Sequence, residues 1–212
     1  ANLDEASRES LLNAISKLLE KHPADEQLQF AKAVLLEQKG ELEQALELAD
    51  RLLADKQNKN VIILKVNALK DLHRSDDAVA FLKDIVEGTS GDSRRLRLIF
   101  ARLLFETRQL DKAREQYEFV LKQAPNDGDV LLALAFIAME QSNDTVAIGY
   151  LKQMIRWNRR VGEAHFYLGS IAEKNKDVPK AIREYRQVGR GYEFLPAQSR
   201  IANLMVTQGR IS

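Results

Sequence analysis

Five alanines recur along the chain at almost equal distances, and this spacing restricts the fold more than any other feature of the sequence. They are Ala45, Ala78, Ala113, Ala147 and Ala181, separated by 33, 35, 34 and 34 residues. Each follows a short polar or glycine-containing stretch, such as KGELEQA or SNDTVA. A small residue at a fixed place in a repeated unit is typical of a point where two helices cross closely. The spacing therefore predicts helical repeats of about 34 residues.

Other residues follow the same period. Pro23 and Pro125, each expected just after a helix end, lie 102 residues apart, which is three such units. Large-small pairs occur upstream of the later alanines, at Phe100-Ala101, Leu134-Ala135 and Leu168-Gly169. One helical turn after each alanine comes a residue expected to face inward: Ala49, Leu82, Tyr117, Leu151 and Tyr185. The alternative, a helical bundle without repeats, would leave this common period to chance.

The composition favours helix throughout. Only four prolines and ten glycines interrupt a chain rich in alanine, leucine, glutamate and lysine, residues that lose little side-chain entropy in a helix. Strand-like alternation is nearly absent. The longest apolar clusters, such as residues 131–139, are far shorter than the roughly 20 residues of a membrane-spanning helix. The expected fold class is all-α, without a transmembrane segment.

Several segments resemble the tetratricopeptide repeat family. HFYLGSIA, residues 165–172, is similar to the family's first-helix signature, with His165 at the tryptophan place. AREQY and AIREY, beginning at Ala113 and Ala181, are similar to the second-helix signature. The resemblance implies a right-handed superhelical solenoid of helix-turn-helix repeats. It divides residues 1–212, as one array, into a half repeat at about 5–25, repeats at about 26–58, 59–93, 94–127, 128–161 and 162–194, and a half repeat at about 195–212.

No catalytic or metal site is expected. The three histidines, His22, His73 and His165, fall in different repeats and lack ligand spacing, and His165 is interpreted as a packing residue. Carboxylate pairs such as Asp76-Asp77 stand at helix starts, where they favour the helix dipole. Motifs for nucleophilic catalysis or for phosphate and dinucleotide binding are absent from the sequence. We therefore expect a protein that is not an enzyme and uses no cofactor.

The charge balance bears on the choice of partner. With 32 basic and 31 acidic residues, the net charge of +1 lacks the excess typical of nucleic-acid binders, so no nucleic-acid partner is expected. The segment RWNRR, residues 156–160, has two interpretations. Either the arginines cover a helix end and Trp157 packs between repeats, or Trp157 anchors an acidic partner.

In the family that the chain resembles, the first helices line a concave groove that binds segments of other proteins. Transferring that face implies a site in which apolar and aromatic residues mix with basic ones: Arg95, Leu98, Arg102, Phe105, Leu132, Phe136, Met139, Phe166, Ser170 and Lys174. Such a surface suits a peptide with apolar anchors and a carboxylate. The alternative is that Phe136 and Phe166 fill the interior. A clamp for chaperone C-termini is not expected, because the corresponding faces carry Phe30, Val34, Ile63 and Asn67.

A narrower resemblance concerns residues 166–188 and 194–210. They are similar to repeat arrays of proteobacterial outer-membrane lipoproteins that act as adaptors for a periplasmic carboxy-terminal processing protease. This resemblance implies a scaffold that brings protease and substrates together, with the full-length protein anchored to the outer membrane in the periplasm. The absence of cysteine fits the periplasm and the cytoplasm equally. The alternatives are an accessory region of a larger enzyme and a self-associating structural module.

The sequence begins and ends in the middle of a predicted repeat, so a fragment of a longer protein is expected. A half repeat leaves one helix face without its neighbour. Apolar residues at the two ends are therefore candidates for a homodimer contact: Leu11, Ile15, Leu18, Ile201, Leu204 and Met205. The alternative is that these side chains pack inward on the adjoining helix.

Overall fold

The computed structural model describes residues 4–54, 57–88 and 94–208. In these residues it contains twelve α-helices and no strand, which confirms the all-α fold class. The helices are α1 (Glu5–Lys21), α2 (Glu26–Lys39), α3 (Leu42–Leu53), α4 (Lys59–Asp71), α5 (Ser75–Gly88), α6 (Arg94–Glu106), α7 (Leu110–Gln123), α8 (Gly128–Glu140), α9 (Asp144–Arg156), α10 (Val161–Lys174), α11 (Val178–Arg186) and α12 (Phe194–Thr207). None of them combines the length and apolar character needed to cross a membrane.

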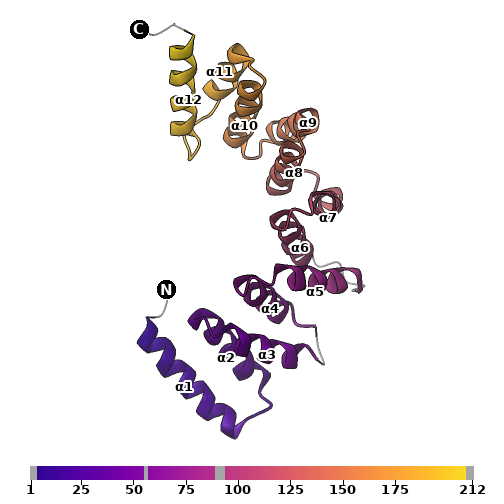
Figure 1. Ribbon diagram of the computed structural model, residues 1–212, viewed down its shortest axis with the longest axis vertical. Helices are drawn as coiled ribbons and strands as arrows, with labels where there is room; N and C mark the ends of the chain where they lie inside the picture. The colour runs from indigo at the N-terminus through magenta and orange to yellow at the C-terminus, as the bar shows by residue number, and fades with distance from the viewer. Residues whose placement is uncertain (1–3, 55–56, 89–93, 209–212) are drawn as a thin grey trace. The chain divides into compact units, whose positions relative to one another are not determined.

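The contacts divide the chain into two compact units, unit 1 (Ala1–Thr107) and unit 2 (Arg108–Ser212). Within each unit every helix packs against the next one along the chain (Figure 1). The two helices of the repeat predicted at 94–127 belong to different units, α6 to unit 1 and α7 to unit 2. Continuity of the repeats across this boundary stays a prediction of the 34-residue period.

The repeating alanines lie where helices cross. All five are fully buried, and the residues one turn later are buried as well. The small members of the large-small pairs are also enclosed, and a Cβ added at Gly169 would lie 2.7 Å from the Tyr185 ring. Helix axes can approach this closely only where one side chain is minimal. The interpretation of the alanines as crossing points is confirmed.

Helix starts are set by short polar side chains. Asp25, Asn58, Asp127, Asn143 and Asp177 each accept a hydrogen bond from a backbone amide in the first turn that follows. These bonds satisfy donors that the first turn of a helix otherwise leaves without a partner. The caps fix where each helix begins, and hence which of its faces meets the core.

A left-handed residue ends five first helices, five positions before each repeating alanine. These residues have φ between 57° and 84° and are Gly40, His73, Arg108, Ser142 and Lys176. At Gly40, His73, Ser142 and Lys176 the next amide also bonds back to a carbonyl inside the helix, as in Glu41 to Leu36 at 2.9 Å. This Schellman arrangement closes the helix end and aims the chain into the second helix.

The ends of the chain pack mostly inward. Ile15, Ile201 and Leu204 are buried, and Met205 contacts the same cluster as Ile201. As homodimer contacts, Ile15, Ile201 and Leu204 are corrected to core positions, because they are buried within their unit; Met205 is only partly buried. Leu11 and Leu18 of α1 do remain substantially exposed.

Candidate functional site

Two first helices of unit 2, α8 and α10, build the main candidate site. Leu134 and Ala135 of α8, and Leu168 and Gly169 of α10, point into the core and so fix the rotation of each helix. The helix faces turned away from these pairs then carry half-buried side chains. Five of the ten predicted groove residues lie there: Phe136, Met139, Phe166 and Ser170, which are partly buried, and Lys174, which is exposed.

Aromatic rings run along this face. Phe136 contacts Tyr167 edge to face with ring centroids 4.8 Å apart, and Tyr167 contacts Phe166 in the same way at 5.4 Å. Phe166 in turn lies 5.6 Å from the buried ring of Tyr185. Edge-to-face contacts hold rings in fixed orientations and add to the free energy of burial. We call Phe136, Phe166 and Tyr167 the aromatic run; each is partly buried and keeps some exposed surface.

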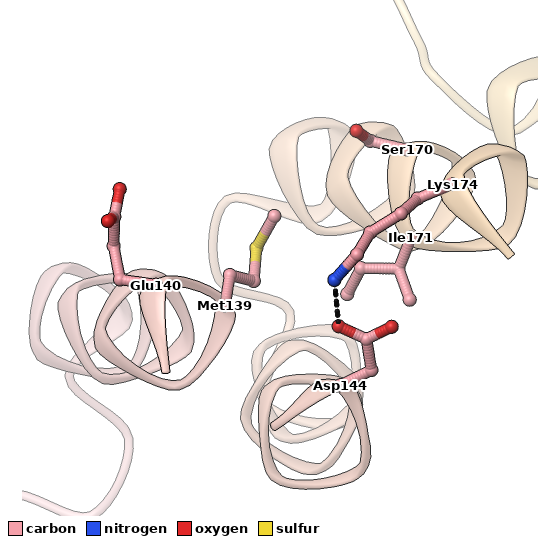
Figure 2. A pocket seen from close by; sticks show the side chains of 6 residues that line it. All are labelled: Met139, Glu140, Asp144, Ser170, Ile171 and Lys174. Carbon is pink, nitrogen blue, oxygen red and sulfur yellow. Dashed lines mark hydrogen bonds and ion pairs between the residues drawn. The ribbon is translucent and has the colours of Figure 1, made fainter. Parts of the chain in front are cut away.

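A cavity of about 350 Å³ adjoins the predicted groove residues. Figure 2 shows the side chains that line it: Met139, Glu140, Asp144, Ser170, Ile171 and Lys174. Met139 and Ile171 supply apolar wall, while the other four supply hydroxyl, carboxylate or ammonium groups. The volume is sufficient for one or two amino-acid side chains rather than for a large cofactor.

Charges at this cavity are paired within the protein. The Lys174 ammonium lies 3.0 Å from the Asp144 carboxylate, which also accepts a 2.8 Å hydrogen bond from the Asn175 amide. The Asn175 amide, and then Lys174, lower the pKa of Asp144 below its ordinary value. Glu140 pairs with Arg108 at 2.8 Å. The cavity therefore presents polar groups with little uncompensated charge.

The tyrosine hydroxyls in and next to the aromatic run stay protonated at neutral pH. Burial and the carboxylate of Glu173, which accepts a 2.7 Å hydrogen bond from Tyr185, raise the pKa of Tyr185 well above its ordinary range. Burial likewise raises the pKa of Tyr167. The Tyr167 hydroxyl can thus act as a hydrogen-bond donor toward a bound segment.

The other predicted groove residues are placed differently. Leu132 of α8 is 6% exposed and belongs to the core, so it offers a partner almost no surface. Arg95, Leu98, Arg102 and Phe105 lie on α6 in unit 1, where the two arginines are exposed and the two apolar residues are half buried.

Unit 1 contains a second groove, of about 210 Å³, between its own first helices. Residues of α2, α4 and α6 line it: Phe30, Val34, Glu37, Asn60, Ile63, Leu64, Asn67 and Arg95. Arg95 is the one predicted groove residue among them. In the sequence, four of these lining residues stand out only as mismatches to a chaperone clamp: Phe30, Val34, Ile63 and Asn67. The local sequence of Glu37 does not indicate that its carboxylate lies in a groove.

His165 and Trp157 have different surroundings. His165 Nδ1 lies 2.8 Å from the Glu184 carboxylate and its side chain is mostly buried, in agreement with a packing role. Trp157, in contrast, is the residue that ends α9 and is half exposed, so part of its side chain is packed and part is open to solvent, and both interpretations of it stay open. Within the described ranges, histidines and carboxylates form no cluster able to hold a metal ion.

Comparisons with known proteins agree with this architecture. A TPR repeat-containing protein of Pseudomonas aeruginosa, PA4667, is 36% identical over 211 residues. The match takes in all of this chain but only 36% of that protein, so the chain spans about a third of its relative's length.

Solved structures share the fold at low identity. MamA from Desulfovibrio magneticus has a TM-score of 0.59 at 16% identity, over 72% of this chain and 86% of its own. YrrB, titled a TPR protein with an unusual peptide-binding site, has a TM-score of 0.57 at 20% identity, over 71% and 77%. A tetratricopeptide repeat protein from Parabacteroides merdae has a TM-score of 0.56 at 16% identity, over 95% and 79%.

The family model described as tetratricopeptide repeat matches residues 12–60, 100–157 and 137–192. These ranges contain four of the five repeating alanines and both helices of the aromatic run. The chain therefore belongs to the tetratricopeptide repeat family.

Proposed function

We propose that this chain is a non-catalytic scaffold that holds a segment of another protein against α8 and α10. The observation that most directly supports this proposal is the row of half-buried aromatic rings on α8 and α10, the helices that contribute most of the lining of the 350 Å³ cavity. The rings belong to Phe136, Tyr167 and Phe166. Apolar surface that is rigid but incompletely covered gains free energy when a partner buries it. Hydrogen bonds to the polar groups around the cavity would fix the orientation of the bound segment.

An extended segment suits the surface. Tyr167 can donate to a backbone carbonyl, and the Ser170 hydroxyl can both donate and accept. Met139 adapts its shape to different apolar side chains, because its thioether chain is unbranched. YrrB, a TPR protein with an unusual peptide-binding site, shows that this fold is compatible with such a partner.

The finer form of the proposal is an adaptor. We propose that the partner segments belong to a carboxy-terminal processing protease and to its substrates, and that the full-length protein is anchored to the outer membrane and faces the periplasm. The similarity of residues 166–188 and 194–210 to such adaptors supports this form. In that arrangement the repeats supply binding and the protease supplies the chemistry.

Site-directed photo-crosslinking tests the proposal. A benzophenone amino acid replaces Met139 in the site, and in a matched control it replaces Val146, an exposed residue of α9. The protein is irradiated in cells of its source and the products are identified by mass spectrometry. We expect position 139 to yield a protein adduct that position 146 does not. Equal yields from both positions would exclude the groove as the binding surface, and an adduct without any protease would leave the scaffold but remove the adaptor.

Self-association is a second candidate, favoured by apolar side chains exposed near the ends of the described chain. Leu11 and Leu18 of α1, and Leu195 and Val206 of α12, are between 42% and 75% exposed. Sedimentation velocity over a hundredfold dilution separates the candidates, since a self-associating module stays oligomeric when no partner is present.

A further inference from the structure

The groove of unit 1 contains a carboxylate that lacks a counter-ion. Glu37 of α2 is partly buried between Phe30 and Val34 on its own helix and Ile63 and Asn67 on α4. Among the described residues Glu37 forms no ion pair; the Asn67 amide and the negative charge of Asp71 both act on its carboxylate. Burial, together with Asp71, raises its pKa above the ordinary value. Glu37 thus lines a groove of mixed apolar and polar character without an ion pair of its own, and the exposed Asp71 adds a second negative charge nearby.

Nearby cations have other partners. Lys70 pairs with Glu106 at 2.7 Å, and Lys39 pairs with Glu41 at 2.8 Å and with Glu9 at 3.3 Å. Arg95 lines the same groove, but it is not one of the groups that shift the pKa of Glu37. Neither Glu37 nor Asp71 therefore has an ion-pair partner in the part of the chain that the structure describes.

We propose that the unit 1 groove binds a protein segment carrying a lysine or arginine between apolar residues, with the basic side chain paired to Glu37 and Asp71. Charge complementarity determines this partner chemistry: the carboxylates accept an ammonium or guanidinium, and the walls of Phe30, Val34 and Ile63 accept the apolar neighbours. Asn67 and Asn60 offer both a donor and an acceptor to the backbone of the segment.

This inference rests on the proposed function only in assuming that grooves between first helices bind protein segments. It adds a requirement that unit 2 does not share, because there Lys174 already neutralises Asp144. The scaffold thus carries two grooves of different selectivity, and unit 1 selects for positive charge.

Two synthetic peptides test the inference on the full chain. They are end-capped nonapeptides with leucines on both sides of the centre, identical except for a central lysine in one and a central glutamine in the other. Titration by fluorescence anisotropy is expected to show about fivefold tighter binding of the lysine peptide at low salt. Half-molar sodium chloride should reduce this preference, because the charges remain partly exposed.

Three variants assign the preference to the groove. Glu37→Gln keeps the shape of the side chain and should bring the ratio close to one, and Asp71→Asn should reduce it less. Glu20→Gln on α1, which is exposed and does not line the groove, removes one negative charge from the same unit and should leave the ratio unchanged. Circular dichroism confirms that each variant keeps its helical content.

The outcomes separate the two proposals. A preference that survives Glu37→Gln with full helicity overturns the assignment to this groove. Equal binding of both peptides overturns the charge selectivity and leaves segment binding intact. If neither peptide binds, while photo-crosslinking at position 139 succeeds, unit 1 is not a binding groove although unit 2 is one.

Discussion

Units 1 and 2 use the same helix-turn-helix design but fill its equivalent positions differently. In unit 1 the two equivalent positions, on α2 and α3, are Ala33 and Ala49, both fully buried in one core cluster. Where α10 crosses α11, the corresponding residues are Gly169 and Tyr185, with the tyrosine ring against the bare glycine backbone. The crossing in unit 2 thereby places a large aromatic ring beneath Phe166 and supports the aromatic run.

The grooves differ in charge as well. In unit 2 the carboxylates of Asp144 and Glu140 have cationic partners inside the unit, whereas Glu37 in unit 1 has none. The difference shows how one repeat can serve several partners: the alanine register preserves the backbone, and the outward positions are free to vary in chemistry.

The largest expected effect concerns the glycine-tyrosine crossing. Gly169→Ala places a methyl group 2.7 Å from the Tyr185 ring, so we expect a loss of about 1–3 kcal/mol in the free energy of unfolding. Gly149→Ala on α9 is the matched control, since nothing lies within 4 Å of its added Cβ. It should stabilise the protein by about 0.5–1 kcal/mol, because alanine is the better helix former. Urea unfolding measures both, and a destabilised control would show that crowding is not the cause.

The helix-ending turns provide the next test. Gly40 in unit 1 and Ser142 in unit 2 occupy the same left-handed position, with φ of 84° and 57°. Gly40→Ala should cost about 1 kcal/mol and Ser142→Gly should gain a similar amount, since a Cβ is strained in this region. Thermal melts of the two variants should therefore shift in opposite directions. A loss of stability in Ser142→Gly would indicate that the serine side chain contributes more than its backbone strain costs.

A drop in pH should distinguish the two grooves. The pKa of Glu37 is raised, so its carboxylate takes up a proton at a higher pH than an ordinary glutamate, and Asp71 and Arg95 are the other charged groups near that groove. The pKa of Asp144 is lowered, so its pair with Lys174 persists. As the pH is lowered toward the range in which glutamates take up protons, the lysine preference of unit 1 should decline, and the decline should begin at a higher pH than for an ordinary glutamate. Anisotropy titrations across this range measure it, with Glu37→Gln as the variant that should show no such change.

Removing the ammonium group of Lys174 should give unit 2 the preference for basic peptides that is proposed for unit 1. Lys174→Gln leaves Asp144 without its ammonium partner, so the cavity gains a negative charge. In a protein that also carries Glu37→Gln, this change should restore a lysine preference of about two- to threefold. Lys152→Gln, an exposed lysine of α9 away from the cavity, is the control. Restoration by the control would mean that net charge, rather than the cavity, sets the preference.

The sequence predicted the register of this fold better than its surfaces. Each repeating alanine is buried as expected, because a crossing constrains residue size at one position. The left-handed turns were not predicted, since only Gly40 carries the usual glycine signal while His73, Ser142 and Lys176 do not.

The sequence pattern of α8 also could not predict which of its apolar residues are fully buried. The run LLALAFIAM is apolar on all sides, so helical period alone did not separate Leu132, which is in the core, from Phe136 and Met139, which keep exposed surface. The pair of Asp144 and Lys174 joins residues 30 positions apart in neighbouring repeats. Such pairs depend on how successive repeats stack, and one sequence does not specify that geometry.

The smallest expected effect is on the free energy of unfolding, which two charge-removing substitutions should change in opposite directions. Glu37 has a raised pKa in the folded state, so its ionisation opposes folding and its contribution to stability is lost as pH rises. Asp144 has a lowered pKa, so its ionisation favours folding and its contribution is lost as pH falls. At neutral pH, Glu37→Gln should therefore raise the free energy of unfolding and Asp144→Asn should lower it, each by about 0.5 kcal/mol or less, because water screens both groups. Urea unfolding of both variants in parallel resolves the sign. A loss of stability in Glu37→Gln would mean that the carboxylate is already compensated in the free protein, and the case for a basic partner at that groove would fail with it.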